Sequence, residues 1–334
     1  MSWELFIGDG QPRRARPNGK AWHRIPKPPP WRTQSATRPP VFDLPDGLTV
    51  AVNAALHLRR PLLLTGAPGS GKSTLAQLLA HELELGPLLR WHITSKSTLT
   101  DALYQYDALG RLHAVQARSN GPAVPGKDPG TEPDAADPQP VGDGTDDVAR
   151  FVALGPLGTA LASRRIRAIL IDEIDKSDLD LPGDLLNVME NGQFTIPVLE
   201  RADGGPFTVR GADHDTYVVA KSGTVSLRLE HFPVIVFTSN RERTFPAPFL
   251  RRCVRFEMPT LNESALRRIV AAHLTDGDVA TAEQATITEF ARRIESGDQL
   301  AVNQLLEFVY LMSGAESGVR AELKKTILQD LGDT

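Results

Sequence analysis

The chain has 334 residues, of which 41% are hydrophobic and 23% charged, and its formal net charge is −4 at pH 7. These values are typical of a globular protein with about two domains. The single cysteine, Cys253, excludes an intrachain disulfide framework, and no apolar run is long enough to cross a bilayer. Because the first residues contain no apolar signal core, we expect a cytoplasmic protein.

The first forty residues predict an extended, proline-rich arm. They hold eight basic side chains against two acidic ones, and their eight prolines prevent helix formation and favour polyproline II. Such an arm could contact nucleic acid or an acidic partner, or could lie along a neighbouring subunit. Its large aromatic side chains, such as Trp3 and Trp31, favour docking on a protein surface over binding to a nucleic-acid duplex.

The segment from Gly66 to Ser73 matches the phosphate-binding loop pattern G-x-x-x-x-G-K-[ST]. An apolar run at 61–65 predicts a buried strand before it, and residues 74–83 predict a helix after it. Backbone amides and the helix dipole then attract phosphate oxygens, Lys72 reaches the β- and γ-phosphates, and the Ser73 hydroxyl can bind Mg²⁺. The residues expected to hold ATP are Gly66, Ala67, Pro68, Gly69, Ser70, Gly71, Lys72, Ser73 and Thr74.

The segments around this loop alternate between helix and strand. Residues 46–58 predict a helix and 88–94 a second strand, whereas 98–118 fit either a helix or a hairpin. Residues 119–147 are acidic, rich in proline and glycine, and almost free of large apolar side chains, so we expect a disordered insertion there. A helix at 157–164 and a third strand at 168–171 follow.

Two adjacent carboxylates, Asp172 and Glu173, end the third predicted strand. Sheets of this class bind ligands at the carboxyl ends of their strands. Asp172 is expected to hold Mg²⁺ beside Ser73, and Glu173 to act as the base that polarises the attacking water. An acidic pair at a strand end is also common on protein surfaces; the phosphate loop upstream favours the functional interpretation.

A helix at 179–190, a long β-hairpin insertion at 193–231 and a fourth buried strand at 233–238 come next. Asn240 follows that strand, where its amide could orient the attacking water near the γ-phosphate. The alternative is an asparagine that only forms a turn. Its position at the end of a strand favours the functional role.

Adjacent arginines, Arg251 and Arg252, precede a short fifth strand at 254–257. They could be ordinary surface residues, or one of them could reach into the nucleotide site of a neighbouring subunit and stabilise charge on the transferred phosphoryl group. We favour the second interpretation, with Arg252 preferred. After Pro259 the pattern predicts four helices, at 262–274, 281–295, 299–313 and 316–330, which indicate a second, helical domain.

These elements, in this order, resemble the AAA+ ATPases over residues 41–330. The segment 189–196 (MENGQFTI), the insertion after the second strand and the predicted hairpin look like the MoxR branch. The resemblance implies an α/β fold: a P-loop αβα sandwich over 41–258 with a parallel sheet of order 5-1-4-3-2, followed by a small all-α lid at 259–334. It also implies a homo-oligomeric, hexameric ring, ATP hydrolysis with Mg²⁺, a chaperone-like role beside a von Willebrand A-type partner, and a link to bacterial defence systems.

One departure concerns the lid. The family usually offers an arginine at the start of the third lid helix, and Gln304 stands at that position here. A neutral amide cannot offset γ-phosphate charge as a guanidinium does, so Arg267 or Arg268 would have to substitute. A slow nucleotide switch that scaffolds a partner complex is therefore the alternative to an active remodeller. A GTP-driven motor is a third hypothesis, although no Asn-Lys-x-Asp motif is present.

Overall fold

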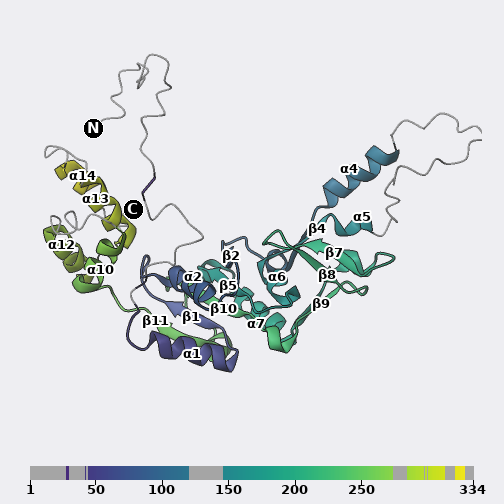
Figure 1. Cartoon of the computed structure of the whole chain (residues 1–334), viewed down its shortest axis with the longest axis horizontal. Coiled ribbons are helices and arrows are strands. Elements are labelled where there is room, and N and C mark those ends of the chain that lie inside the picture. The colour runs from purple at the N-terminus through teal and green to yellow at the C-terminus, as the bar shows by residue number, and fades with distance from the viewer. Residues whose placement is uncertain are drawn as a thin grey trace, which may run out of the picture. The chain divides into compact units, whose positions relative to one another are not determined.

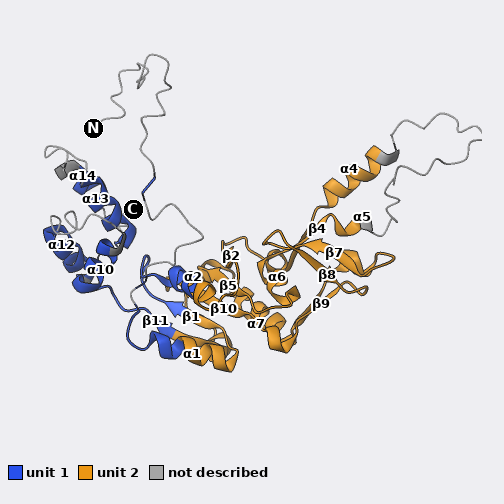
Figure 2. Ribbon diagram, viewed as in Figure 1, with its two compact units in different colours: residues 1–51, 64–78, 256–334 blue, residues 52–63, 79–255 orange. Residues whose placement is uncertain are grey.

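The computed structural model describes residues 28–29, 42, 44–119, 146–273, 284–296, 298, 300–312 and 320–327 (Figure 1). Most of the predicted arm, and residues 120–145 of the predicted insertion, lie outside these ranges. The chain divides into two compact units: residues 1–51, 64–78 and 256–334 form the first, and residues 52–63 and 79–255 the second (Figure 2). Among the described residues, no helix has the length and apolar character needed to span a bilayer.

A five-stranded sheet forms the centre of the fold. Its strands are β1 (Leu62–Thr65), β2 (Leu89–His92), β5 (Ala168–Asp172), β10 (Val234–Ser239) and β11 (Val254–Glu257). Their order in the sheet is β11-β1-β10-β5-β2. Numbered along the chain within this sheet alone, the order is 5-1-4-3-2, which confirms the prediction. β5 pairs in parallel with β10 on one side and with β2 on the other, and its first four residues are buried, which explains its unbroken apolar run.

Four helices that accompany this sheet lie where the apolar pattern predicts them. They are α1 (Leu48–Leu58), α2 (Lys72–Glu82), α6 (Pro156–Ala162) and α7 (Leu181–Asn191). The short helix α9 (Ala247–Arg252) was not predicted. α7 ends at Gly192, which adopts a left-handed conformation with φ of 62°. Glycine reaches this conformation without a steric penalty, so the Asn191-Gly192 pair ends the helix as expected.

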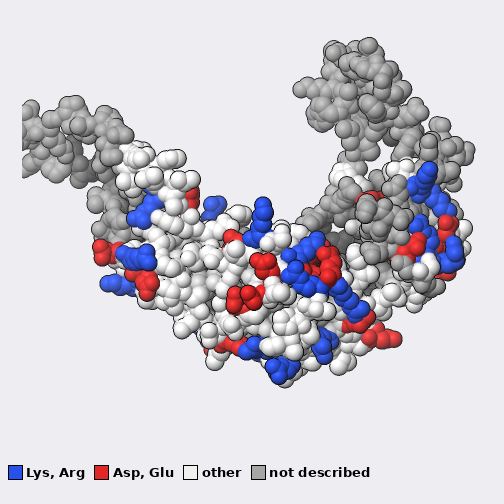
Figure 3. Space-filling model, turned by 180° about the vertical axis from the view of Figure 1, so that it is seen from behind, with Lys and Arg blue, Asp and Glu red and all other residues white. Residues whose placement is uncertain are grey.

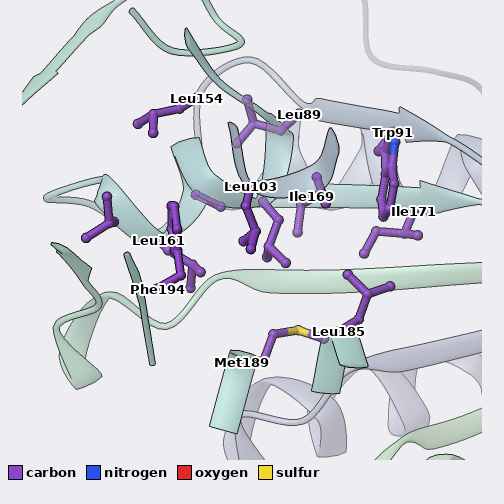
Figure 4. Close-up of a cluster of buried hydrophobic side chains, with 14 of the residues drawn as sticks. Leu89, Trp91, Leu103, Leu154, Leu161, Ile169, Ile171, Leu185, Met189 and Phe194 are labelled. Atoms are coloured by element: carbon purple, nitrogen blue, oxygen red, sulfur yellow. The ribbon is translucent and has the colours of Figure 1, made fainter. Parts of the chain in front are cut away.

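The core of the second unit lies between the sheet and the helices that cover it. Side chains of β2 and β5 meet side chains of α7 and of the segment that follows it (Figure 4). The labelled members are Leu89, Trp91, Leu103, Leu154, Leu161, Ile169, Ile171, Leu185, Met189 and Phe194. Burial of these apolar surfaces, at about 25 cal/mol per Å², is what holds the carboxyl ends of β5 and β10 in place.

A second sheet of four strands, in the order β3-β4-β7-β8, accounts for the segments that the sequence left undecided. Its strands are β3 (Tyr104–Tyr106), β4 (Val152–Leu154), β7 (Phe207–Arg210) and β8 (Thr216–Val219), and it is accompanied by α3 (Leu99–Leu103), α4 (Ala108–Ser119) and α5 (Asp146–Ala149). The segment 98–118 therefore contains helix and strand together.

The segment 193–231 is more elaborate than the single long hairpin that the sequence suggests. β7 and β8 do form an antiparallel hairpin. However, β6 (Gln193–Thr195) pairs with β9 (Thr224–Ser226) instead of extending it. Pro197 begins the short helix α8 (Pro197–Glu200) between β6 and β7, and a proline inside a strand would remove a ladder hydrogen bond, so the chain leaves the sheet there.

The C-terminal region is helical, as predicted. Its described helices are α10 (Glu263–His273), α12 (Gln284–Glu295), α13 (Val302–Met312) and α14 (Arg320–Ile327). Buried side chains such as Leu266, Phe290 and Val309 form a hydrophobic cluster of their own. The domain boundaries proposed at residues 40 and 258 remain predictions.

Candidate nucleotide site

The phosphate loop follows β1 and ends where α2 begins, at Lys72. Gly69 and Gly71 have φ angles of 75° and 85°. Residues with a side chain rarely adopt these values, so the loop conformation depends on glycine at both positions. The strand, loop and helix N-terminus therefore have the arrangement that presents backbone amides to an anion.

Lys72 is 7% exposed and its ammonium group donates to two carbonyl oxygens of the loop itself. The acceptors are the oxygens of Gly66 and Ala67, each 2.8 Å from Nζ. The hydroxyl oxygen of Ser70 is also buried, and no described residue provides it with a hydrogen-bond partner. The loop thus concentrates a buried cation and an unsatisfied hydroxyl at the place where phosphate oxygens are expected.

Two contacts with this loop come from residues distant in sequence, both in the first unit. Gly71 and Gly69 leave no room for a side chain. A Cβ atom at Gly71 would lie 2.5 Å from the ring of Phe42, and a Cβ atom at Gly69 would lie 2.9 Å from the amide nitrogen of Val302. Phe42 and the start of α13 therefore pack directly on the loop. The loop pattern contains no signal for either residue, which is why sequence reasoning missed them.

Gln304, at the position where the family usually has arginine, has a structural role. Its side-chain oxygen accepts from the Ala301 amide (2.8 Å), and its side-chain nitrogen donates to the Ile327 carbonyl (3.1 Å). It therefore caps the start of α13 and fixes the end of α14. Arg267, one proposed substitute, forms an ion pair with Glu263 on its own helix.

Asp172 and Glu173 lie at the end of β5, beside β10. Thr238 of β10 connects them: its hydroxyl donates to Asp172 Oδ1 and accepts from the Glu173 amide (2.9 Å). Glu173 has a φ of 60° and a ψ of 48°, a left-handed conformation that is uncommon for a residue with a side chain. The chain therefore turns sharply at Glu173.

The Glu173 carboxylate is surrounded by donors. Oε1 accepts from the Asn240 side chain (3.3 Å), and Oε2 lies 2.7 Å from Lys176 Nζ and 3.5 Å from His92 Nε2. The structure thus brings three of the predicted site residues together: Asp172, Glu173 and Asn240.

Asp175 is a site residue whose role the sequence did not reveal. It is 3% exposed, and its Oδ2 accepts from the amides of Asn240 (2.9 Å) and Glu242 (3.0 Å). Asp175 therefore fixes the turn that carries Asn240. In the sequence, the only indication of this role was that a further acidic residue follows three residues after Asp172.

An open cavity of about 430 Å³ adjoins this group. Its lining comes from the segments after β2, β5 and β10, and consists of His92, Ile93, Thr94, Ser95, Asp175, Lys176, Glu242 and Arg243. His92 and Lys176 contact both Glu173 and the cavity, so the candidate base lies at its edge.

Arg251 and Arg252, the two arginines predicted to reach into the nucleotide site of a neighbouring subunit, lie at the end of α9. Arg252 Nε forms an ion pair with Glu190 Oε1 at 2.6 Å, and the two side chains are 40% and 52% exposed. Arg251 is exposed. Arg252 therefore has an intrachain partner on α7, whereas Arg251 projects outward.

The donor atoms present suit magnesium, which prefers oxygen ligands and usually keeps several waters. The Asp172 carboxylate and the Ser73 hydroxyl are oxygen donors of that type. In the described part of the chain, no group of three or more His, Cys, Asp or Glu side chains forms an all-protein metal cage. The oxygen donors and the lack of such a cage both fit a magnesium ion that is held by one or two side chains together with a phosphate.

A strand-loop-helix phosphate site, with carboxylates at the end of another strand of the same sheet, defines a P-loop nucleotide protein. The family model described as AAA domain (dynein-related subfamily) matches residues 61–253, more than half of the chain. The protein therefore belongs to this family of AAA+ ATPases.

Other comparisons give remote similarities. No curated protein sequence matches significantly. The Holliday junction branch migration motor RuvB of Thermotoga maritima is 14% identical with a TM-score of 0.37, over 84% of this chain and 66% of RuvB. NtrX of Brucella abortus, solved in complex with ADP, is 13% identical with a TM-score of 0.42, over 86% of this chain and 55% of NtrX.

Proposed function

We propose that this protein binds and hydrolyses ATP and uses the reaction to remodel a partner protein. The observation that carries the hydrolytic part is the group at the ends of β5 and β10, where Glu173 receives a hydrogen bond from Asn240. A protein that only binds nucleotide does not need a carboxylate and an amide held together at this edge of the sheet.

In the proposed reaction a water oxygen attacks the γ-phosphorus while the bond to the β,γ-bridging oxygen breaks. Glu173 accepts the proton that the water loses, Asn240 orients that water, and Lys72 neutralises charge on the phosphate oxygens. The products are ADP and inorganic phosphate. Residues 66–74 would bind the nucleotide. Asp172 and Ser73 would hold Mg²⁺, which when bound offsets negative charge on the phosphates.

We further propose that the active form is a homo-oligomeric ring, for which a hexamer is our expectation from the resemblance to MoxR proteins. Arg252 or Arg251 would then act in a neighbouring subunit. The same resemblance supports a von Willebrand A-type partner and a role in bacterial defence. On the face drawn in Figure 3, basic and acidic side chains of the described residues lie among one another, an arrangement better suited to a protein partner than to a phosphate backbone.

A slow nucleotide switch that scaffolds a partner complex is the second candidate. The role of Gln304 as a helix cap favours it, because this side chain cannot replace the guanidinium that would couple the lid to the γ-phosphate.

Steady-state ATP turnover of the wild type and of Glu173→Gln separates the two candidates. Glutamine keeps the size of the side chain but cannot accept the proton, so we expect turnover to fall about 100-fold or more, with ATP binding retained. Equal, slow turnover in both proteins would exclude the remodeller. Competition between ATP and GTP in the binding assay tests whether the site prefers the adenine or the guanine nucleotide.

A further inference from the structure

We infer that the ring of Phe42 makes an autoinhibitory contact with the phosphate loop. The ring lies where a nucleotide must approach Gly71, so it has to move away before the nucleotide binds. This inference rests on the proposed binding of ATP and ADP to residues 66–74. It adds a contact that lowers the affinity for nucleotide and that links the loop to the chain segment before α1.

The place of the ring is defined by its distance from Gly71. A Cβ atom at Gly71 would lie 2.5 Å from Cε2 and 3.1 Å from Cδ2 of Phe42. Because a carbon–carbon single bond is about 1.5 Å long, the edge of the ring lies within about 4 Å of the Gly71 Cα. Both residues belong to the first compact unit, so this contact lies within one unit.

A bound phosphate needs the same space. Gly71 directly precedes Lys72, where α2 begins, and amides at a helix N-terminus bind phosphate oxygens at about 2.9 Å. A phosphate oxygen on the Gly71 amide would therefore lie about 4 Å from the Gly71 Cα, as the ring edge does. Glycine at this position of the loop pattern lets a ligand approach the bare backbone. The ring of Phe42 and the nucleotide therefore compete for Gly71.

The contact is weak enough for a nucleotide to displace. Phe42 is only half-buried, and half of the free energy of burying a phenylalanine corresponds to about a three- to tenfold change in an equilibrium constant. The ring also offers no oxygen acceptor to the loop amides, whereas a phosphate offers several. When only a fraction of the molecules has the ring withdrawn, the apparent affinity for nucleotide falls by that fraction.

The contact also provides a route for regulation through the N-terminal segment. Phe42 follows the predicted arm and lies six residues before Leu48, the first residue of α1. Coupling between two binding events is reciprocal. A partner that draws the arm and the ring away from Gly71 would therefore tighten nucleotide binding, and bound nucleotide would tighten the binding of that partner by the same factor.

The test is ADP binding to the full chain, with the dissociation constant from isothermal titration and the rate constants from stopped-flow measurements with a fluorescent ADP analogue. We expect Phe42→Ala to bind ADP about three- to tenfold more tightly, through faster association, because the ring acts before the nucleotide binds. Phe42→Tyr keeps the ring and should bind as wild type does. Phe256→Ala is the matched control: it removes a half-buried ring of the same unit that lies beside Gly47, and it should leave the affinity unchanged.

Unchanged or weaker binding by Phe42→Ala, in a protein that circular dichroism shows to be folded, would overturn the inference; weaker binding would mean that the ring supports the nucleotide. A gain that arises only from slower dissociation, or that Phe42→Tyr shares, would also overturn it, because the ring would then not compete for Gly71. If neither wild type nor Phe42→Ala binds ADP, the proposed nucleotide site itself fails. If wild type binds and Phe42→Ala binds no more tightly, only the autoinhibitory contact is excluded.

Discussion

At the scale of single residues, Lys72 is held in an unusual environment for a charged group. Its ammonium is almost fully buried and donates to two carbonyl oxygens of the loop. A buried cation is costly unless it is paired with opposite charge. A bound phosphate would place negative charge beside this ammonium, and such charge-assisted hydrogen bonds are roughly twice as strong as neutral ones.

We predict that Lys72→Ala weakens ATP binding about tenfold to 100-fold, because charge-assisted hydrogen bonds to phosphate contribute about 1.5–3 kcal/mol. Isothermal titration with ATP measures the loss. The control is Lys221→Ala, at an exposed lysine, which should bind as wild type does. Circular dichroism should show that both variants retain the fold. Full ATPase activity in Lys72→Ala would contradict the assignment of the loop.

At the scale of elements, a buried ion pair fixes the β7–β8 hairpin to the start of β5. Arg167 is fully buried; its Nη1 lies 2.5 Å from Asp213 Oδ2, and its Nη2 donates to the Pro87 carbonyl. Tyr217 of β8 donates to the same Asp213 oxygen at 2.7 Å. A buried pair is strongly destabilising when one partner is removed, because the other charge remains uncompensated.

This cluster makes stability depend on pH in two windows. Burial acts to raise the pKa of Asp213, but the hydrogen bonds from Arg167 and Tyr217 and the Arg167 charge together lower it from its ordinary value of 3.8. Its contribution is therefore complete above about pH 4 and is lost as the pH falls through the lowered value. Burial raises the pKa of Tyr217 to about 12, so its contribution is lost as the pH rises from 10 toward 12.

We predict that Asp213→Asn lowers the free energy of unfolding by about 3–5 kcal/mol at neutral pH. Tyr217→Phe keeps the ion pair and removes two hydrogen bonds, the one that Tyr217 donates to Asp213 and the one that it accepts from Arg167, and should cost about 1–2 kcal/mol. Urea unfolding between pH 3 and pH 7 measures both. The wild type should lose more stability on acidification than Asp213→Asn, whose amide does not titrate. Parallel acid profiles of the two proteins would contradict the role of Asp213.

The sequence revealed those elements whose pattern is local. Buried strands such as β5 and β10 are continuous apolar runs, and a glycine ends α7. The strands and the end of the helix can therefore be predicted without knowledge of distant contacts. The four-stranded sheet is different, because β4 pairs with β7 more than fifty residues away, with Ala153 opposite Arg210. Asp172, Glu173 and Asn240 were predicted from their positions at strand ends. Phe42 and Asp175 reach the loop and the Asn240 turn through folded contacts that no motif records.

At the scale of the whole molecule, the proposed ring requires a residue that acts on a neighbouring subunit. Arg252 is the preferred candidate, yet it forms an intrachain pair with Glu190. Both side chains are substantially exposed, so that pair contributes no more than about 1 kcal/mol and can open when a neighbour binds. Arg251 is already exposed and is the second candidate.

We predict that Arg252→Ala lowers kcat about 1,000-fold or more while ATP binding remains close to wild type. The reason is that an arginine supplied by a neighbouring subunit stabilises charge on the phosphoryl group only in the transition state. Glu190→Gln breaks the intrachain pair but keeps the arginine, and should keep most of the activity. If Glu190→Gln lost as much activity as Arg252→Ala, the arginine would act through Glu190 and not through a neighbour. The kcat of Arg251→Ala, measured in the same assay, tests whether Arg251 takes this role instead.

Mixing variants tests whether the site is shared between subunits. In a ring that contains Arg252→Ala and Lys72→Ala subunits, the intact phosphate loop of one subunit can face the intact arginine of the other, so mixed rings should recover part of the activity that each variant lacks alone. Recovery should depend on the mixing ratio and should disappear under conditions in which light scattering shows only single subunits. Turnover that stays at the level of the separate variants, in mixtures shown to assemble, would mean that each site is complete within one chain and that a ring is not needed for hydrolysis.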